Sequence, residues 1–312
     1  MKELRIIYMG TPEFAVAPLQ ALVENNYNVI AVITAPDKPA GRGKKIQQSA
    51  VKKYAVEKNL LVLQPEKLKA PDFLKELEAL KADLQIVVAF RMLPELVWNM
   101  PPLGTFNLHA SLLPQYRGAA PIHRAIMNGE TKTGITTFFL QHEIDTGNIL
   151  LQKEVAITEN MTTGELYDIL MHKGADLVLT TVDGIINNTI EEKPQQEISD
   201  LKSAPKIFKE DCKIDWNSKL DEIHNHIRGL NPFPVAWTKL NEKNLKVFMG
   251  EKEYVKHSLP MASILTDNKT YFKIAVADGY YHLKELQLEG KKRIPIEDFL
   301  RGYHSNLTQI GD

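Results

Sequence analysis

Short, uninterrupted apolar runs alternate with amphipathic segments through the first half of the chain. The runs Leu4–Met9, Val29–Thr34 and Ile86–Phe90 have the length of buried strands. Apolar residues at helical spacing lie from about Phe14 to Glu24 and again from Phe73 to Leu80. Continuous apolar strands between amphipathic helices predict a parallel sheet that is covered on both faces. Such a sheet binds ligands beyond the carboxyl ends of its strands.

The second half of the chain follows a different pattern. A long helix is predicted from Thr163 to about Ile186, and the polar stretch after it predicts a linker at residues 189–205. One helix near Leu220 to Arg228 and short strands at 234–240, 246–249, 271–276 and 281–288 are typical of a small β-barrel. We therefore expect an α/β domain with a Rossmann-like parallel sheet at residues 1–188 and a smaller barrel domain at residues 206–312.

Composition narrows the class of protein. With 312 residues, 44% of them hydrophobic and 25% charged, the chain is typical of a globular protein of two domains. The apolar runs are too short to cross a bilayer and the N-terminus has no signal-peptide pattern, so we expect a cytoplasmic protein with no membrane partner. Cys212 is the only cysteine, and no metal site is expected. Because the formal net charge is -1, any contact with nucleic acid needs a local basic patch.

A strand-like segment after Gly104 carries the first candidate chemistry. Because side chains alternate along a strand, Asn107 and His109 share one face and Leu108 points to the other. An amide donor beside an imidazole can stabilise an oxyanion. Taken alone, the pair is more often a buried structural histidine beside an asparagine in a turn.

The loop after this segment changes that balance. Residues 111–122 read SLLPQYRGAAPI, in which Pro114 fixes the backbone and Arg117 offers a fork of donors. Together with Asn107, His109 and the DTG tripeptide that begins at Asp145, this string resembles the signature of the folate-dependent formyltransferase family. The resemblance implies that Asn107, His109 and Asp145 are catalytic.

The DTG tripeptide is also the core of the aspartic proteases. Those enzymes need two such carboxylates that share a proton, in small all-strand domains. This chain has one DTG triplet, inside its alternating strand–helix half. We therefore set the protease interpretation aside.

Further segments resemble the members of the formyltransferase family that act on methionyl-tRNA. Residues 213–216 (KIDW) and 227–234 (IRGLNPFP) match the second domain of those members, which is similar to an oligonucleotide-binding (OB-like) barrel. On composition alone the basic loop at 34–45 is a solvated surface segment. It matches the loop that enters the acceptor stem, however, and the resemblance implies that it contacts initiator tRNA.

The barrel domain offers fewer contacts to tRNA. It has 17 Lys and Arg against 15 Asp and Glu, so we expect only modest, salt-sensitive binding to phosphates. The residues expected to bind tRNA are Lys38, Arg42, Lys44 and Lys45 in the loop, and Lys291 and Arg293 in the barrel domain.

The reaction that the resemblance implies is direct transfer of the formyl group of 10-formyltetrahydrofolate to the amino group of initiator methionyl-tRNA, with no metal and no covalent enzyme intermediate. Asn107 and His109 would donate to the developing oxyanion. Asp145 would orient His109, favour its charged form and help to remove the amine proton. Ser111 lacks the glycines of a nucleophile elbow, so we do not expect it to act as a nucleophile.

The folate is expected along residues 90–93 and 141–147 and on the loop after His109. The chain departs from the family pattern here: Arg91 stands where glycine is usual, Ile144 where leucine is common, and Asn148 replaces a frequent aspartate. The residues expected to contact folate are Phe90, Arg91, Met92, Leu93, Ser111, Leu112, Leu113, Pro114, Gln141 and Ile144.

Three alternative functions stay open at this point. A formyltransferase for a UDP-amino sugar and a formyltetrahydrofolate hydrolase would share the catalytic residues, but neither needs the basic loop. A catalytically silent RNA-binding module is disfavoured because the set of Asn107, His109 and Asp145 is complete. We expect the protein to be a monomer.

Overall fold

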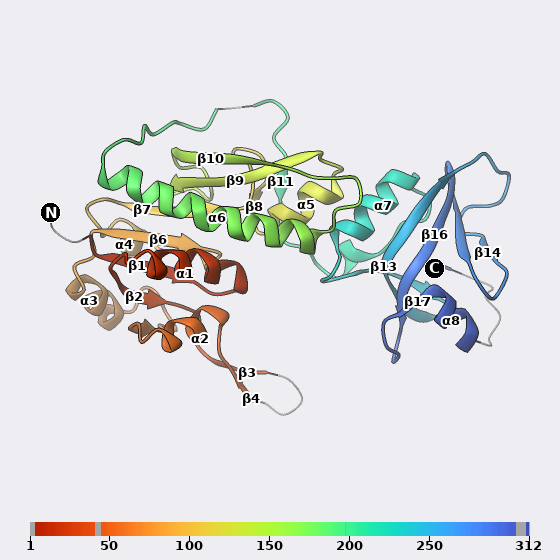
Figure 1. Ribbon diagram of the computed structural model, residues 1–312, viewed down its shortest axis with the longest axis horizontal. Helices are drawn as coiled ribbons and strands as arrows, with labels where there is room; N and C mark the ends of the chain where they lie inside the picture. The colour runs from red at the N-terminus through yellow and green to blue at the C-terminus, as the bar shows by residue number, and fades with distance from the viewer. Residues whose placement is uncertain (1–3, 41–44, 197, 304–309, 312) are drawn as a thin grey trace. The chain divides into compact units, whose positions relative to one another are not determined.

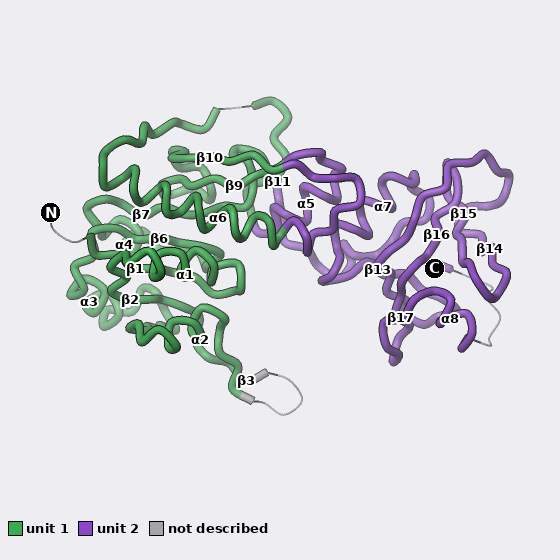
Figure 2. The backbone as a smooth tube through the Cα atoms, in the orientation of Figure 1, with its two compact units in different colours: residues 1–118, 133–155, 167–203 green, residues 119–132, 156–166, 204–312 purple. Residues whose placement is uncertain are grey.

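The computed structural model describes residues 4–40, 45–196, 198–303 and 310–311. The chain divides into two compact units, each made of several stretches of sequence (Figure 2). Unit 1 comprises residues 1–118, 133–155 and 167–203, and unit 2 comprises residues 119–132, 156–166 and 204–312. The limits at 188 and 206 given by the sequence pattern stay a prediction.

A seven-stranded sheet forms the centre of unit 1, in the order β10-β9-β7-β6-β1-β2-β5. The five strands from β5 to β7 pair in parallel, whereas β9 runs antiparallel to β7. The predicted parallel sheet of the α/β class is therefore confirmed. The strand bounds are β1 Ile6–Gly10, β2 Val29–Ile33, β5 Val62–Leu63, β6 Leu84–Val88, β7 Thr105–His109, β9 Lys132–Phe139 and β10 Ile149–Ala156.

Helices cover both faces of this sheet. On one face, apolar residues of β1, β2 and β6 pack with Phe73 and Leu77 of α3 (Pro71–Ala79) and with Val97 of α4 (Glu95–Trp98). On the other face lie α1 (Val16–Glu24) and α6 (Thr163–Ile186), which cross the sheet in Figure 1. The contact of α6 with β7 is close, because a Cβ on Gly174 would lie 2.8 Å from a methyl carbon of Leu108. The two-sided cover explains why the strands read as continuous apolar runs.

Unit 2 is built on a six-stranded sheet whose main path is β12-β13-β16-β15-β14, with β17 paired to β16. The printed pairs are all antiparallel. Helix α7 (Leu220–Gly229) begins where Leu220 donates its N–H to the Asp278 carboxylate at 2.9 Å, and its apolar side faces a core that contains Trp216 and Tyr281. The predicted small β domain is confirmed. Its strands are β12 Ala236–Leu240, β13 Lys243–Tyr254, β14 Ile264–Thr266, β15 Phe272–Val276, β16 Gly279–Leu288 and β17 Ile294–Pro295.

The remaining elements are short. They are η1 Glu13–Ala15, β3 Lys38–Ala40, β4 Lys45–Gln47, α2 Ala50–Glu57, β8 Arg117–Gly118, α5 Pro121–Met127, β11 Ser203–Ala204, η2 Glu210–Cys212 and α8 Ile296–Gly302. In the described part of the chain, no helix, long or short, has the length and apolar character needed to span a membrane.

Candidate active site

Strand β7 places Asn107 and His109 on one face of the sheet. Its neighbour Leu108 packs on the opposite face against α6, so strand alternation fixes the direction of both polar side chains. His109 is buried, with 6% of its surface exposed, while Asn107 is partly exposed. Among the described residues, no hydrogen bond engages the Asn107 amide, which leaves its N–H donors for a ligand.

Asp145 reaches His109 from the loop between β9 and β10. Its Oδ2 lies 3.7 Å from His109 Nδ1, and the same oxygen accepts a hydrogen bond of 2.9 Å from the Gly118 N–H. His109 Nε2 lies 2.9 Å from the backbone oxygen of Tyr116. Both ring nitrogens therefore face oxygen acceptors. An imidazolium ring has an N–H for each of these oxygens, whereas a neutral ring has an N–H for only one of them.

The loop that follows β7 is held by hydrogen bonds. The Ser111 hydroxyl, fully buried, donates to the Gln115 carbonyl at 2.6 Å, so it is engaged in the loop itself. Leu113 is also buried, and Gln152 donates to its carbonyl at 2.9 Å. Leu112 lies close to Gly134, and Pro114 is partly exposed. Any contact of Ser111 or Leu113 with a ligand would have to involve the backbone.

The segment after β6 and the loop that holds Asp145 lie side by side. His142 Nε2 is 3.5 Å from the Glu95 carboxylate, and its ring meets Trp98 edge-on at 5.6 Å. Exposed apolar side chains occur on both segments: Met92 is 73% exposed and Ile144 is 59% exposed. The structure thus brings two of the stretches expected to contact folate to one place.

Other residues expected to contact folate have structural partners. Arg91 donates to the carbonyl oxygens of Pro65 and Glu66, and its guanidinium carbon lies 5.6 Å from the centre of the Phe90 ring. Burial lowers the pKa of Arg91 from its ordinary value. Leu93 is buried in the apolar core, whereas Gln141 is exposed. Arg91 therefore anchors its own segment to the chain after β5.

Gln195 is a residue of this site that sequence analysis missed. It lies in the stretch predicted as a linker, where it bonds both to the backbone of the Asp145 loop and to the Arg117 side chain. Partners 50 and 78 positions away leave no local pattern in the sequence, so only the fold could reveal them.

The residues expected to bind tRNA are described in part. Lys38 is exposed on β3, whereas Arg42 and Lys44 lie outside the described residues, as does the side chain of Lys45. In unit 2, Lys291 is exposed, and Arg293 pairs with Glu285 at 2.5 Å with its guanidinium carbon 4.2 Å from the Phe248 ring centre. No group of three metal-binding side chains occurs in the part of the chain that the structure describes.

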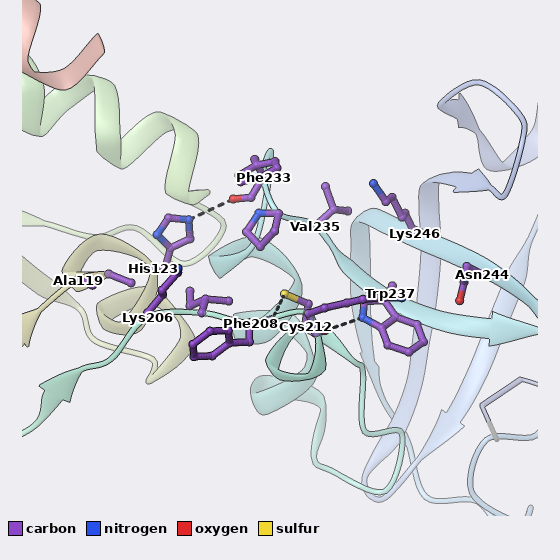
Figure 3. Close-up of a pocket in the computed structure, with 14 residues that line it drawn as sticks. Ala119, His123, Lys206, Phe208, Cys212, Phe233, Val235, Trp237, Asn244 and Lys246 are labelled. Atoms are coloured by element: carbon purple, nitrogen blue, oxygen red, sulfur yellow. Dashed lines mark hydrogen bonds between the residues drawn. The ribbon is translucent and has the colours of Figure 1, made fainter. Parts of the chain in front are cut away.

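A hollow of about 650 Å³ opens within unit 2, lined in part by residues of the 111–122 and 227–234 motifs (Figure 3). Two lysines lie over aromatic rings in its wall: Lys206 over Phe208 at 5.5 Å and Lys209 over Trp237 at 5.6 Å. His123 Nε2 lies 3.1 Å from the Phe233 carbonyl, and burial lowers the pKa of His123. The lining is Ala119, Ala120, His123, Lys206, Ile207, Phe208, Lys209, Cys212, Phe233, Pro234, Val235, Trp237, Asn244 and Lys246.

Comparison with known families agrees with the geometry. The formyl transferase family model matches residues 4–182, and the model of the formyl transferase C-terminal domain matches residues 206–304. The chain belongs to the formyl transferase family. It is 56% identical over 310 residues to a methionyl-tRNA formyltransferase of Bacteroides thetaiotaomicron, covering 97% of this chain and 96% of that protein. It is 53% identical over 306 residues to a methionyl-tRNA formyltransferase of Flavobacterium johnsoniae, covering 97% of both.

Solved structures share the fold at lower sequence identity. One is an N-formyltransferase from Helicobacter canadensis in complex with folinic acid and dTDP-3-aminofucose, with a TM-score of 0.67 and 24% identity over 93% of this chain and all (100%) of that one. Another is HypX from Aquifex aeolicus in complex with tetrahydrofolic acid, with a TM-score of 0.64 and 19% identity over 96% of this chain and 48% of that one.

Proposed function

We propose that this protein transfers the formyl group of 10-formyltetrahydrofolate to the amino group of initiator methionyl-tRNA. The observation that carries the proposal is the pairing of Asp145 with His109 at 3.7 Å, beside an Asn107 amide on the same strand face. The set occurs in a chain that is more than half identical to proteins named for this reaction, over nearly the full length of both.

Each of the three side chains has a distinct task in this proposal. The amine adds to the formyl carbon, a C–N bond forms, and the formyl oxygen gains negative charge. Asn107 donates an N–H to that oxygen, a contact worth about 3 kcal/mol in comparable acyl-transfer sites. Asp145, with His109, takes up the proton that the amine loses and returns it to the folate nitrogen as the bond between that nitrogen and the formyl carbon breaks.

Both ring nitrogens of His109 already have oxygen neighbours. Nε2 lies 2.9 Å from the Tyr116 carbonyl oxygen and Nδ1 lies 3.7 Å from the Asp145 carboxylate, so neither is directed at a substrate oxygen. The sequence-based expectation was that His109 donates directly to the oxyanion. The geometry favours Asn107 as the direct donor.

The surroundings of the Asp145–His109 pair, called the dyad below, suit a flat, partly apolar donor molecule. The exposed side chains of Met92, Leu96 and Ile144 lie on the two segments that His142 and Glu95 join. Exposed apolar groups beside a few polar ones are typical of small-molecule sites. We infer that these segments hold the pterin ring of the folate.

The tRNA part of the proposal rests on the named relatives and on local charge. The formal net charge of -1 gives no general attraction to RNA, so binding depends on patches. We assign one patch to Lys38, Arg42, Lys44 and Lys45, and the second to Lys291 and Arg293. The first would meet the acceptor end and the second the phosphate backbone.

A second candidate function is formylation of a sugar nucleotide. It comes from the solved structures, because one similar fold is named a sugar 3N-formyl transferase, at 23% identity, and another, at 24%, is an N-formyltransferase in complex with dTDP-3-aminofucose. Identity at that level supports the fold alone. A formyltetrahydrofolate hydrolase would use the same dyad, with water in place of the amine.

Transfer of labelled formyl from 10-formyltetrahydrofolate tests these functions against one another. The acceptors are charged initiator methionyl-tRNA, free methionine, a UDP-4-amino sugar and buffer alone. Label in the tRNA fraction alone is expected. Label in the sugar nucleotide, or release of formate without an acceptor, would reject the assignment to tRNA while leaving the catalytic set in place.

A further inference from the structure

The side chain of Gln195 uses its full hydrogen-bonding capacity. Its Nε2 donates to the backbone oxygens of Asp145 at 2.8 Å and Gly147 at 2.9 Å, while its Oε1 accepts from Arg117 Nε at 3.0 Å and Nη2 at 2.6 Å. A primary amide offers two donors and two acceptor sites, so none is left over. Its orientation is therefore fixed on both sides.

The backbone that Gln195 holds has an uncommon conformation. Asp145 has a φ of +56°, in the left-handed region that few non-glycine residues adopt. The turn is also tight, because a Cβ on Gly147 would lie 1.6 Å from the Phe139 carbonyl oxygen. The two bonds from Gln195 lie on either side of Thr146 and fix the turn that directs the Asp145 carboxylate at His109.

The same stretch of chain supports the other acceptor of His109. Tyr116 accepts from His109 Nε2 through its carbonyl, and its own N–H donates to the Lys202 carbonyl at 2.6 Å. Gln195 and Lys202 thus contact the backbones of both groups that face the imidazole. These two residues, which the sequence alone places in a polar linker, support the pairing of Asp145 with His109.

We propose that Gln195 is a positioning residue for formyl transfer: anchored by Arg117, it holds the Asp145 turn so that the carboxylate faces His109 Nδ1. Only the expected change in kcat rests on the proposed function, because the position of the Asp145 turn can be tested without it. Loss of the two bonds to the turn lets the carboxylate move, and a misplacement of about 1 Å can cost about 100-fold in rate. We expect kcat to fall by about 10- to 100-fold, with KM for both substrates within about twofold of the parent value.

Two variants separate positioning from simple packing. Gln195→Glu keeps the size of the side chain and its acceptor toward Arg117, but an ionised carboxylate has no N–H for the two carbonyl oxygens. Gln195→Ala removes all four bonds. Glu192→Ala is the matched control, because Glu192 accepts from Asn148 of the same loop at 3.0 Å and makes no bond to Asp145 or Gly147.

The measurements are kcat and KM for each variant, urea unfolding, and the nitrogen chemical shifts of the His109 ring by NMR at constant pH. Both Gln195 variants should have a lower kcat than the parent, and Gln195→Glu should keep an unfolding midpoint close to that of the parent. In both variants the nitrogen chemical shifts of the His109 ring should move toward those of an isolated imidazole. Glu192→Ala should change none of these quantities.

The proposal is overturned if both variants keep kcat within threefold of the parent, if Glu192→Ala loses as much, or if the His109 ring signals stay in place. The NMR result needs no acceptor substrate. An enzyme that formylated a sugar instead of tRNA would therefore overturn the proposed function without deciding the role of Gln195.

Discussion

Asn107 on β7 of unit 1 keeps its side-chain donors open to a ligand, whereas most of the motif residues compared with it in unit 2 are buried. In unit 1, Asn107 is partly exposed and its amide has no hydrogen-bond partner among the described residues. In unit 2, the matched segments 213–216 and 227–234 provide Ile214 and Trp216, each 3% exposed, and Arg228, 6% exposed, whereas Phe233 in the second segment is 77% exposed. The unit 1 motif thus offers one side chain that is free to act on a ligand, while most of the unit 2 motif residues compared with it build the fold.

Arg228 illustrates the second role. Its guanidinium donates to the Met161 carbonyl at 2.9 Å and to the Asn225 side chain at 2.8 Å, and burial lowers its pKa. Trp216 likewise donates its indole N–H to the Thr238 hydroxyl at 3.0 Å. An arginine in a domain expected to bind nucleic acid would ordinarily be assigned to phosphate, but this one ties α7 to the chain before α6. A family motif alone therefore does not separate binding residues from folding residues.

The largest effect that would sharpen this contrast is expected at Asp145. Replacement by Asn keeps the size of the side chain but removes its charge and its ability to take up a proton. We expect kcat to fall by about 10²- to 10⁴-fold, the usual contribution of a positioned general base. Folate binding, measured by calorimetry, should stay within a few-fold of the parent. A variant that kept more than about a tenth of the rate would remove Asp145 from the chemistry.

Asn107→Ala should show the next largest effect, and it should separate activity from stability. Loss of one oxyanion donor is expected to reduce kcat by about 10²- to 10³-fold. Because Asn107 has no described hydrogen bond to lose, the free energy of unfolding should change by no more than about 0.5 kcal/mol. The two quantities are measured by steady-state kinetics and by urea unfolding. A large loss of stability would place Asn107 with the folding residues and weaken the contrast between the units.

The sequence was sufficient for β7 because strand alternation is a local rule. It placed Asn107 and His109 on one face, and the structure shows Leu108 packed on the other. Strand ends were less accurate: the third run was predicted to end at Phe90, but β6 ends at Val88 because Ala89 adopts a positive φ of 47°. A single backbone angle of this kind has no signature in the apolar pattern.

Partners that are distant in sequence could not be predicted. A glutamine in a polar stretch is typical of a solvated linker, and only the fold brings Gln195 to the Asp145 loop. The contact of Arg91 with folate stays a prediction, and the sequence did not reveal that its two terminal nitrogens donate to the carbonyls of Pro65 and Glu66. In both cases the residue type could be read from the chain, but its partners depend on tertiary contacts.

Acid should destabilise unit 2 through its buried histidines. Burial, followed by the charges of Lys252 and Arg228, lowers the pKa of His224 to about 4, and burial also lowers that of His226. The unfolded chain then binds the proton more tightly, so the free energy of unfolding falls as the pH drops from about 6.5 to 4. We expect His224 to account for about 2 kcal/mol of that loss, after allowance for its remaining contact with solvent.

Urea unfolding at pH 7.0 and 4.5 tests the predicted loss of stability. Unfolding is monitored by tryptophan fluorescence in a Trp98→Phe background, so that the signal comes from Trp216 and Trp237. His224→Gln should flatten the dependence of stability on pH. An equal slope in the presence and absence of His224 would assign the acid sensitivity to other groups. The carboxylates with lowered pKa, such as Glu159 and Asp221, add to the loss of stability from about pH 5 downward, where they begin to bind protons in the unfolded chain, so the His224→Gln comparison is needed to separate the two contributions.

The smallest effect is expected at the surface of unit 2, where two basic residues close in sequence have different surroundings. Arg293 is paired with Glu285 and stacked on Phe248, whereas the Lys291 side chain is exposed with no ion pair among the described residues. A lysine that is free of protein partners can release one counterion on binding a phosphate. Lys291→Ala should therefore weaken tRNA binding by a few-fold and reduce the slope of log Kd against log salt by about 1.

Arg293→Ala is the matched comparison for this last test. Since its charge is already balanced by Glu285, its removal should change the salt slope less than removal of Lys291, and the lost packing on Phe248 should appear in urea unfolding. Filter binding of charged initiator tRNA across a salt series measures the slopes. Equal slopes for the two variants would mean that tRNA breaks the ion pair between Arg293 and Glu285. Arg293 would then bind phosphate in the complex although it is paired within the free protein.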